Sequence, residues 1–166
     1  MDAFEKVIEV LEAYPYKIHH NDEEGYAQLG DNELCIEVIN QSDENLFIEF
    51  KSNEVKVNFY FHEDRFDISY DDEIYWLIGL LDDILHNRRC AGCLFYRDDE
   101  FYKLMGSCFC KKSDIDKSVE EVFSFIFELD EYRKKLEINS GKASYVFWDP
   151  SLNKEVPINK KEELFH

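Results

Sequence analysis

Basic side chains are scarce in this 166-residue chain, which has 19 Lys and Arg residues against 37 Asp and Glu. The imbalance lies in residues 1–132, with 32 acidic and 12 basic side chains, whereas residues 133–166 have 5 and 7. A domain this acidic repels phosphate backbones and anionic lipids. We therefore expect it to bind neither nucleic acid nor membranes, and to be steered electrostatically toward a basic protein.

The chain also lacks the short motifs of phosphate binding and of nucleophilic catalysis. Its six glycines form neither the dinucleotide-binding pattern nor the P-loop pattern, and Ser107 lacks the flanking glycines of a nucleophile elbow. We therefore predict a protein that is not an enzyme and that uses no cofactor.

Long apolar stretches are missing as well. Met1 and Asp2 lead straight into an amphipathic pattern, without the basic and apolar regions of a signal peptide. The longest apolar cluster, at residues 76–81, is far shorter than the ~20 residues of a membrane span. Five cysteines, an odd number, fit reduced thiols better than a disulfide framework. These features predict a cytoplasmic protein.

The composition is that of a folded domain, because 45% of the residues are hydrophobic and 16% are aromatic. We predict a single globular domain over residues 1–166, with a main body at 1–137 and a C-terminal strand and polar tail at 138–166.

Hydrophobic periodicity predicts the first half of the fold. A helix starts at Asp2, where Asp2 and Glu5 form a predicted cap pair, and it ends at Tyr14 and Pro15. The period then falls to two, which is typical of β-strands. We predict an antiparallel meander of four strands at residues 34–39, 46–50, 55–61 and 66–70, with breaks at 40–45, 52–53 and 62–65.

Asp71 and Asp72 are predicted to cap a second helix, which residues 87–89 end. Leu77 and Leu81 lie at the centre of its apolar stripe and should be buried. The elements predicted after it are a hairpin of strands 90–97 and 101–110 with its turn at Asp98, Asp99 and Glu100, a long helix opened by Ser113 and Asp116 that buries Phe123 and runs to about Glu137, and a strand at 143–148.

The predicted order is therefore helix, four strands, helix, two strands, helix and strand. Strands that are segregated from the helices and joined by short turns are typical of an α+β fold. We predict an antiparallel sheet, made of the meander and the hairpin, with three helices packed on one of its faces.

One face of the meander is a candidate interface. If Val55, Val57, Phe59 and Phe61 point inward, alternation places the intervening side chains on the other face. Exposed aromatic residues surrounded by acids are typical of an interface. The alternative is that a further element, such as the strand at 143–148, covers this face. The outward-facing residues are predicted to be Lys56, Asn58, Tyr60 and His62, joined by Phe47 and Glu49.

The cysteines offer one candidate metal site. Cys90, Cys93, Cys108 and Cys110 approach the open end of the predicted hairpin, and four thiolates suit tetrahedral zinc. However, the second pair has one intervening residue where zinc motifs have two or more, and extended backbone points Cys90 and Cys93 to opposite faces. The alternative is that all four are small apolar residues within the sheet. We expect no bound zinc.

Acidic clusters beside histidines could also suggest metal binding. His19 and His20 precede such a cluster at residues 21–24, and His62 lies beside another at residues 64–73. Neither has the fixed spacing of a ligand loop. We interpret the first as a loop. In the second, we interpret Asp71 and Asp72 as helix caps and the other acids as solvated surface.

Two resemblances bear on function. The element order from Asp2 to about Glu137 resembles that of the type III secretion chaperones, small acidic proteins that dimerise and hold an unfolded segment of a secreted client. In size, acidity and lack of a catalytic motif, the chain is also similar to immunity proteins of bacterial polymorphic toxin and contact-dependent inhibition systems. Those proteins bind a cognate toxin domain, often a basic nuclease, and block it.

These resemblances leave three classes of function open. An immunity protein would form a one-to-one complex with a basic toxin domain, whereas a secretion chaperone would be a homodimer. A metal-binding enzyme is the third alternative. We favour the first and expect a monomer or homodimer whose encounter with a basic protein depends on projecting turn acids. The predicted partner-binding residues are Asp71, Asp72, Asp98, Asp99 and Glu100, with Tyr60 as an aromatic anchor.

Overall fold

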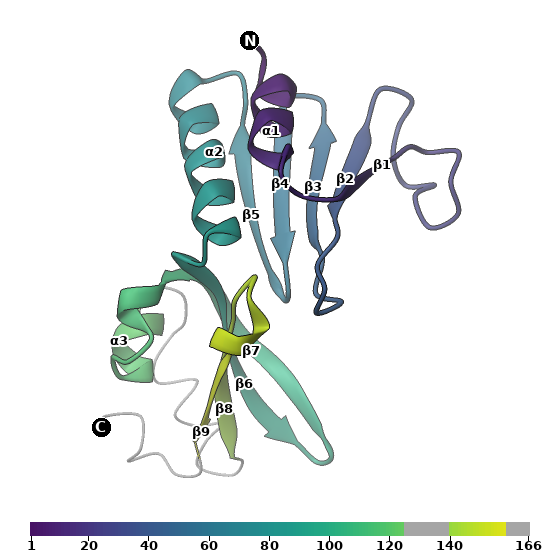
Figure 1. Cartoon of the computed structure of the whole chain (residues 1–166). Coiled ribbons are helices and arrows are strands. Elements are labelled where there is room, and N and C mark those ends of the chain that lie inside the picture. The colour runs from purple at the N-terminus through teal and green to yellow at the C-terminus, as the bar shows by residue number, and fades with distance from the viewer. Residues whose placement is uncertain (125–139, 159–166) are drawn as a thin grey trace. The chain divides into compact units, whose positions relative to one another are not determined.

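The computed structural model describes residues 1–124 and 140–158 and divides the chain into two compact units, Met1–His86 and Asn87–His166 (Figure 1). Each unit has its own antiparallel sheet, and the described part of the chain contains three α-helices, so the α+β class is confirmed. The single domain over 1–166 stays a prediction, as does its division at residue 137, which lies outside the described residues.

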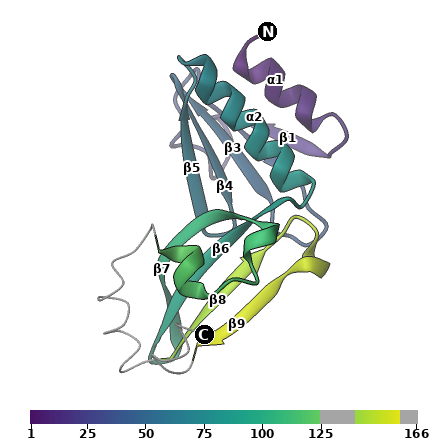
Figure 2. The same ribbon diagram turned by 90° about the vertical axis from the view of Figure 1, so that its left-hand side faces the viewer.

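Unit 1, residues Met1–His86, is a five-stranded meander covered by two helices. The strands pair in chain order, and α1 and α2 lie side by side over one face of the sheet (Figures 1 and 2). Phe4 of α1 contacts Phe50 edge-to-face at 5.6 Å between ring centroids. The elements of unit 1 are α1 (Ala3–Leu11), β1 (Tyr16–His19), β2 (Leu34–Val38), β3 (Leu46–Lys51), β4 (Glu54–Phe59), β5 (His62–Asp67) and α2 (Asp71–Leu85).

The two helix starts in unit 1 use different devices. The predicted cap pair of α1 is confirmed, since Glu5 N donates to Asp2 Oδ1 at 2.8 Å and Asp2 N donates to Glu5 Oε2 at 3.1 Å. The prediction that Asp71 and Asp72 cap α2 is wrong. Tyr70 is the N-cap without a side-chain bond, and the two acids lie in the first turn, where they interact favourably with the helix dipole.

The turn between β4 and β5 is two residues earlier than the predicted break at 62–65. Tyr60 adopts φ 55° and forms a two-residue turn with Phe61, so β5 already begins at His62. The register pairs Phe59 with His62 and Val57 with Asp64. His62 therefore lies on the helix-covered side, contrary to prediction, and Phe61, predicted to be in the core, is 57% exposed.

The described residues of unit 2 (Asn87–His166) contain a four-stranded sheet with strand order β7-β6-β8-β9. Helix α3 (Val119–Phe123) begins later than the predicted long helix. Residues Lys112–Asp114 form a separate 3-10 turn, and Ser118 is the N-cap that accepts a hydrogen bond from Glu121 N at 3.2 Å. The predicted continuation to Glu137 lies outside the described residues. The α-helices and strands described in unit 2 are β6 (Arg89–Asp98), β7 (Phe101–Lys111), α3 (Val119–Phe123), β8 (Gly141–Val146) and β9 (Lys154–Ile158).

The predicted strand at 143–148 is β8, and it does not cover the sheet of unit 1. It pairs with β6 and β9 inside the second sheet, which corrects that expectation. The sequence analysis also missed β9, whose Pro157 is tolerated because β9 is an edge strand.

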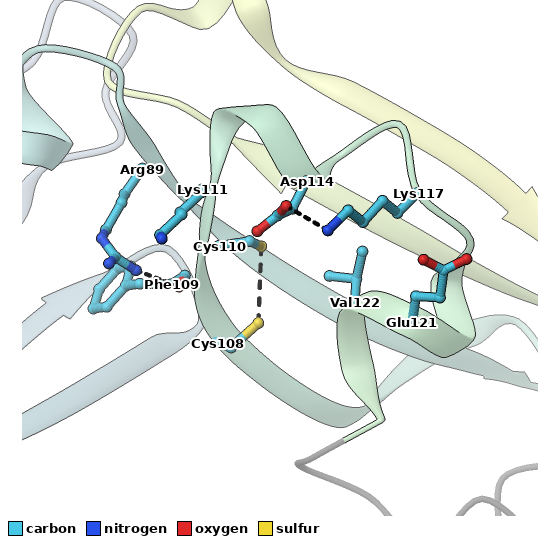
Figure 3. Close-up of a pocket in the computed structure, with 9 residues that line it drawn as sticks. All are labelled: Arg89, Cys108, Phe109, Cys110, Lys111, Asp114, Lys117, Glu121 and Val122. Carbon is cyan, nitrogen blue, oxygen red and sulfur yellow. Dashed lines mark hydrogen bonds and ion pairs between the residues drawn. The ribbon is translucent and has the colours of Figure 1, made fainter.

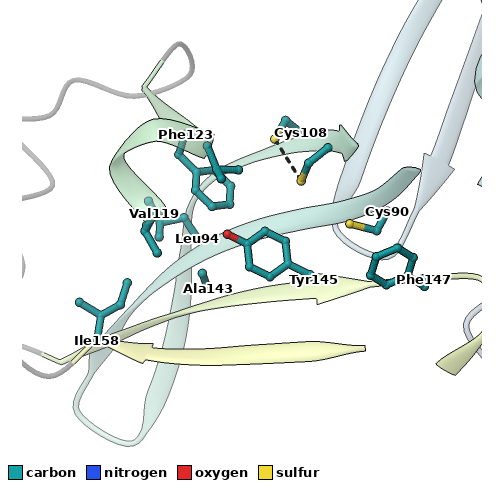
Figure 4. Packing of buried hydrophobic residues seen from close by; sticks show 11 residues of the cluster. Cys90, Leu94, Cys108, Val119, Phe123, Ala143, Tyr145, Phe147 and Ile158 are labelled. Carbon is teal, nitrogen blue, oxygen red and sulfur yellow. Dashed lines mark hydrogen bonds between the residues drawn. The ribbon is translucent and has the colours of Figure 1, made fainter. Parts of the chain in front are cut away.

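The core of unit 2 lies between its sheet and α3 (Figure 4). Phe123 of α3 stacks over Tyr145 at 6.2 Å between ring centroids, and both side chains are at most 1% exposed. Gly92 lies beneath this pair, with Cys110 of the neighbouring strand beside it. The predicted burial of Phe123, and of Leu77 and Leu81 in unit 1, is confirmed.

Candidate protein-binding surface

The acidity of the chain is confined to one unit. Residues 1–86 have 22 acidic and 5 basic side chains, whereas residues 87–166 have 15 and 14. The sequence division at residue 132 concealed this contrast, because the two units meet at residues 86 and 87 and only the fold shows that boundary. Unit 1 therefore carries nearly all of the net negative charge of the chain.

The structure does not bring the six predicted partner-binding residues together. Asp71 and Asp72 are exposed on the first turn of α2. Tyr60 is half-buried in the β4–β5 turn, at the other end of the six-residue strand β5, where its ring contacts Phe61 at 4.5 Å between centroids. A strand of this length spans about 20 Å. Tyr60 therefore cannot share a small contact patch with Asp71.

The other three predicted acids belong to unit 2. Asp99 and Glu100 form the exposed β6–β7 turn, and Asp99 has φ 55°. Asp98 is half-buried and forms an ion pair with Lys103 at 2.6 Å. These acids lie on a unit whose charges nearly balance, which weakens their case as the source of long-range attraction.

The outward face of α2 carries two exposed aromatic residues that the sequence analysis missed. Tyr75 is 78% exposed and Trp76 is 56% exposed. At helical spacing they share a stripe with Asp72, Gly79 and Asp83. A helical-wheel count could have found them, since this stripe lies opposite the buried one.

The outer face of the five-stranded sheet forms a second candidate surface. Phe47 pairs with Asn58 and Glu49 with Lys56, so these four residues share this face as predicted. The loop between β1 and β2 lines it, and a cavity of about 370 Å³ opens between them. Its lining residues are Gly25, Tyr26, Gln28, Cys35, Phe47, Glu49, Lys56, Asn58 and Glu63.

His19 joins that loop to the sheet. It is the last residue of β1, and its Nδ1 lies 2.6 Å from Glu23 Oε2 while its Nε2 lies 3.0 Å from Glu37 Oε1. Tyr26 stacks on the imidazole at 4.2 Å between ring centroids. The loop carries both Glu23 and Tyr26. His19 therefore fixes the position of Tyr26, one of the loop residues that line the cavity.

The charges around His19 shift its pKa and those of its partners. Partial desolvation lowers the pKa of His19, but the hydrogen bonds to Glu23 and Glu37 outweigh it, so the pKa is raised. The hydrogen bond from His19 lowers the pKa of Glu23. Desolvation raises the pKa of Glu37, but the bonds from Asn45 and His19 outweigh it and the pKa is lowered.

These shifts predict a pH dependence of stability. Because the folded-state pKa of His19 is raised, its contribution is complete below the ordinary histidine value of about 6.5 and is lost as pH rises through the raised value. The lowered pKa values of Glu23 and Glu37 make their contribution complete above about 4.5, and it is lost as pH falls further. We expect the stability difference between wild type and His19→Gln to shrink as pH rises above about 6.5 in urea denaturation. A difference that does not change with pH would contradict this assignment.

The four candidate zinc ligands lie on two faces of the second sheet. Cys90 pairs with Cys110, and Cys108 Sγ lies 3.8 Å from Cys110 Sγ on the side that packs against α3. Cys93 pairs with Ser107 and points to the opposite side. Within residues 1–124 and 140–158, no three His, Cys, Asp or Glu side chains are grouped so that they could bind a metal ion.

Cys108 and Cys110 border a small cavity of about 270 Å³ between β7 and α3 (Figure 3). Lys117 pairs with Asp114 at 2.9 Å and lowers the pKa of that carboxyl. A hydrogen bond from Cys108 lowers the pKa of the Cys110 thiol. The hydrogen bond between Cys110 and Cys90 and the burial of Cys110 outweigh this effect, so the pKa of Cys110 is raised. Cys110 is therefore protonated at neutral pH and unsuited to nucleophilic chemistry.

No family model, curated protein or solved structure matches the chain. None of the described helices is both long enough and apolar enough to cross a membrane.

Proposed function

We propose that the chain is an acidic protein-binding module that neutralises a basic partner protein in the cytoplasm, as immunity proteins do with a cognate bacterial toxin domain. The proposal assigns it no catalytic step. The observation that carries it is the concentration of acidic side chains in one compact unit, with 22 acids and 5 bases in residues 1–86.

Charge concentrated in this way favours a particular class of partner. Unit 1 attracts a basic surface over roughly a Debye length, about 8 Å at physiological salt, and repels nucleic acid and anionic lipid. Such complementarity raises the association rate and excludes wrong partners. An inhibitor of a basic nuclease needs both properties, because it must bind before the nuclease reaches its own acidic substrate.

The direct test uses the gene next to that of this chain, since an immunity protein is encoded beside its toxin. We expect expression of the neighbouring product alone to stop growth of a bacterial host, and co-expression with this chain to restore it. The purified proteins should form a one-to-one complex whose association slows as salt is raised. An acidic partner or a small-molecule ligand would refute the proposal.

The predicted acids can be tested in two sets, one on each unit. We expect Asp71→Asn with Asp72→Asn to lower the association rate at low salt by roughly tenfold and to flatten its salt dependence. The matched control neutralises Asp98, Asp99 and Glu100 and should have a smaller effect, because unit 2 is nearly balanced in charge. If stopped-flow measurements show unchanged rates and salt slopes for both variants, none of the five acids belongs to the encounter surface.

A further inference from the structure

We propose that the outward stripe of α2, formed by Asp72, Tyr75, Trp76, Gly79 and Asp83 and here called the α2 face, is the surface on which the basic partner docks. This inference rests on the proposed function and adds the location and chemistry of the contact. It replaces Tyr60 as the aromatic anchor with Trp76 and Tyr75.

The α2 face has the composition of a protein-binding centre. Figure 2 shows α2 in front of the sheet of unit 1, which its buried stripe covers. Leu77, Leu81 and Ile84 are fully buried, whereas Tyr75 and Trp76 are 78% and 56% exposed. Two large aromatic rings directed to solvent do not contribute to the core, and Trp and Tyr are the residues most enriched at binding hot spots.

Gly79 is the second observation that points to a partner. It is exposed in the interior of α2, and a Cβ placed on it would meet no atom within 4 Å. Glycine at such a position disfavours the helix relative to alanine. No neighbouring atom of the chain requires a glycine at this position. We therefore infer that the open space at Gly79 admits the backbone of another chain.

The acidic charge of α2 favours a basic protein as the partner that binds the α2 face. Its fifteen residues include five acids and no Lys or Arg. Three of them, Asp71, Asp72 and Glu73, stabilise the helix N-terminus, but Asp82 and Asp83 lie toward the C-terminal end, where the helix dipole disfavours negative charge. The helix dipole does not favour Asp83, and helix propensity does not favour Gly79, although both residues lie on the α2 face.

The contact that fits this arrangement is a basic segment whose backbone comes close to Gly79. Its Arg or Lys side chains would lie on the rings of Trp76 and Tyr75 and reach the carboxylates of Asp72 and Asp83. Cationic groups on aromatic rings and beside carboxylates gain from both interactions once water is excluded.

Gly79→Ala separates folding from binding. We expect this variant to raise the urea midpoint of the free chain, because alanine is the better helix former, and to weaken binding of the purified basic partner at least tenfold. Trp76→Ala should weaken binding by thirtyfold or more, mainly through faster dissociation. The matched control is Phe61→Ala, which removes another exposed aromatic ring of unit 1 and should leave affinity unchanged. Tyr60→Ala tests the earlier anchor in the same way.

Each outcome decides the inference. If wild type binds the partner and both α2 variants bind equally well, the docking surface is elsewhere while the proposed function stands. If Gly79→Ala destabilises the free chain, the glycine serves the fold and the inference loses its second observation. If sedimentation shows a wild-type dimer that Trp76→Ala dissociates, a second copy occupies the α2 face and the inference is wrong. If wild type binds no basic protein, both proposals fail together.

Discussion

Leu81→Ala is expected to lower the free energy of unfolding by about 2 to 5 kcal/mol, the range found when a fully buried leucine is cut back to alanine. Leu81 has no exposed surface and lies on the face of α2 that covers the first sheet. The loss combines the transfer free energy of the removed atoms with the cavity that they leave. Chemical denaturation followed by circular dichroism measures it.

Tyr75→Ala is the matched control for this prediction, because it removes a larger side chain from the opposite face of the same helix. We expect it to change the free energy of unfolding by less than about 0.5 kcal/mol, as is usual for surface substitutions. A loss below about half a kcal/mol for Leu81→Ala would show that the buried face of α2 is assigned wrongly.

Gly92→Ala is expected to destabilise unit 2 by about 1 to 3 kcal/mol through overpacking. The added Cβ would collide with Cys110 Sγ and would lie 3.4 Å from Phe123 Cζ and 3.5 Å from Tyr145 Cδ1. Glycine normally weakens a strand, so its place in the centre of β6 is explained by the close packing of α3 and the neighbouring strands above it.

The double variant Gly92→Ala with Cys110→Ala tests that explanation. Removing Cys110 Sγ makes room for the new methyl group, so we expect the two changes to cost less together than the sum of their separate losses. Unfolding of the two single variants and the double variant gives the coupling free energy. Strict additivity would mean that Gly92 is needed for another reason.

The sequence predicted those elements whose side chains repeat a single pattern. The capping pair Asp2 and Glu5 and the buried stripe through Leu77 and Leu81 were both correct, because local hydrogen bonding and burial determine them. Strand β1 was missed because it has only four residues, and β9 because Pro157 interrupts its pattern.

The wrong predictions for Tyr60, Phe61 and His62 have one cause, the misplaced turn between β4 and β5, because the turn sets the register of the two strands. An apolar alternation that ran through Phe59 and Phe61 gave no sign that the chain turns after Phe59. Once the turn shifts by two residues, Tyr60 leaves the strand and His62 changes face. The positive φ of Tyr60 is unusual for an aromatic residue, and no local rule predicts it.

The candidate binding surface could be predicted only in part. The excess of acid was evident from composition, but its confinement to unit 1 depends on where the fold divides the chain. The exposed rings of Tyr75 and Trp76 were obscured because they adjoin the buried stripe in sequence and seem part of one apolar cluster. The two faces of α2 are separated by placing each residue on a helical wheel, whereas the number of hydrophobic residues alone does not separate them.

The pairing order of the strands also bears on the order in which the two units fold during synthesis. In unit 1 every strand pairs with its neighbour in sequence. In unit 2, β6 also pairs with β8, which begins about forty residues after the end of β6 and must be synthesised before the sheet can form. All the residues of unit 1 leave the ribosome before those of unit 2, and N-terminal units generally fold first during translation. The acidic unit is therefore expected to be complete, with α2 in place, while the nearly neutral unit is still being made.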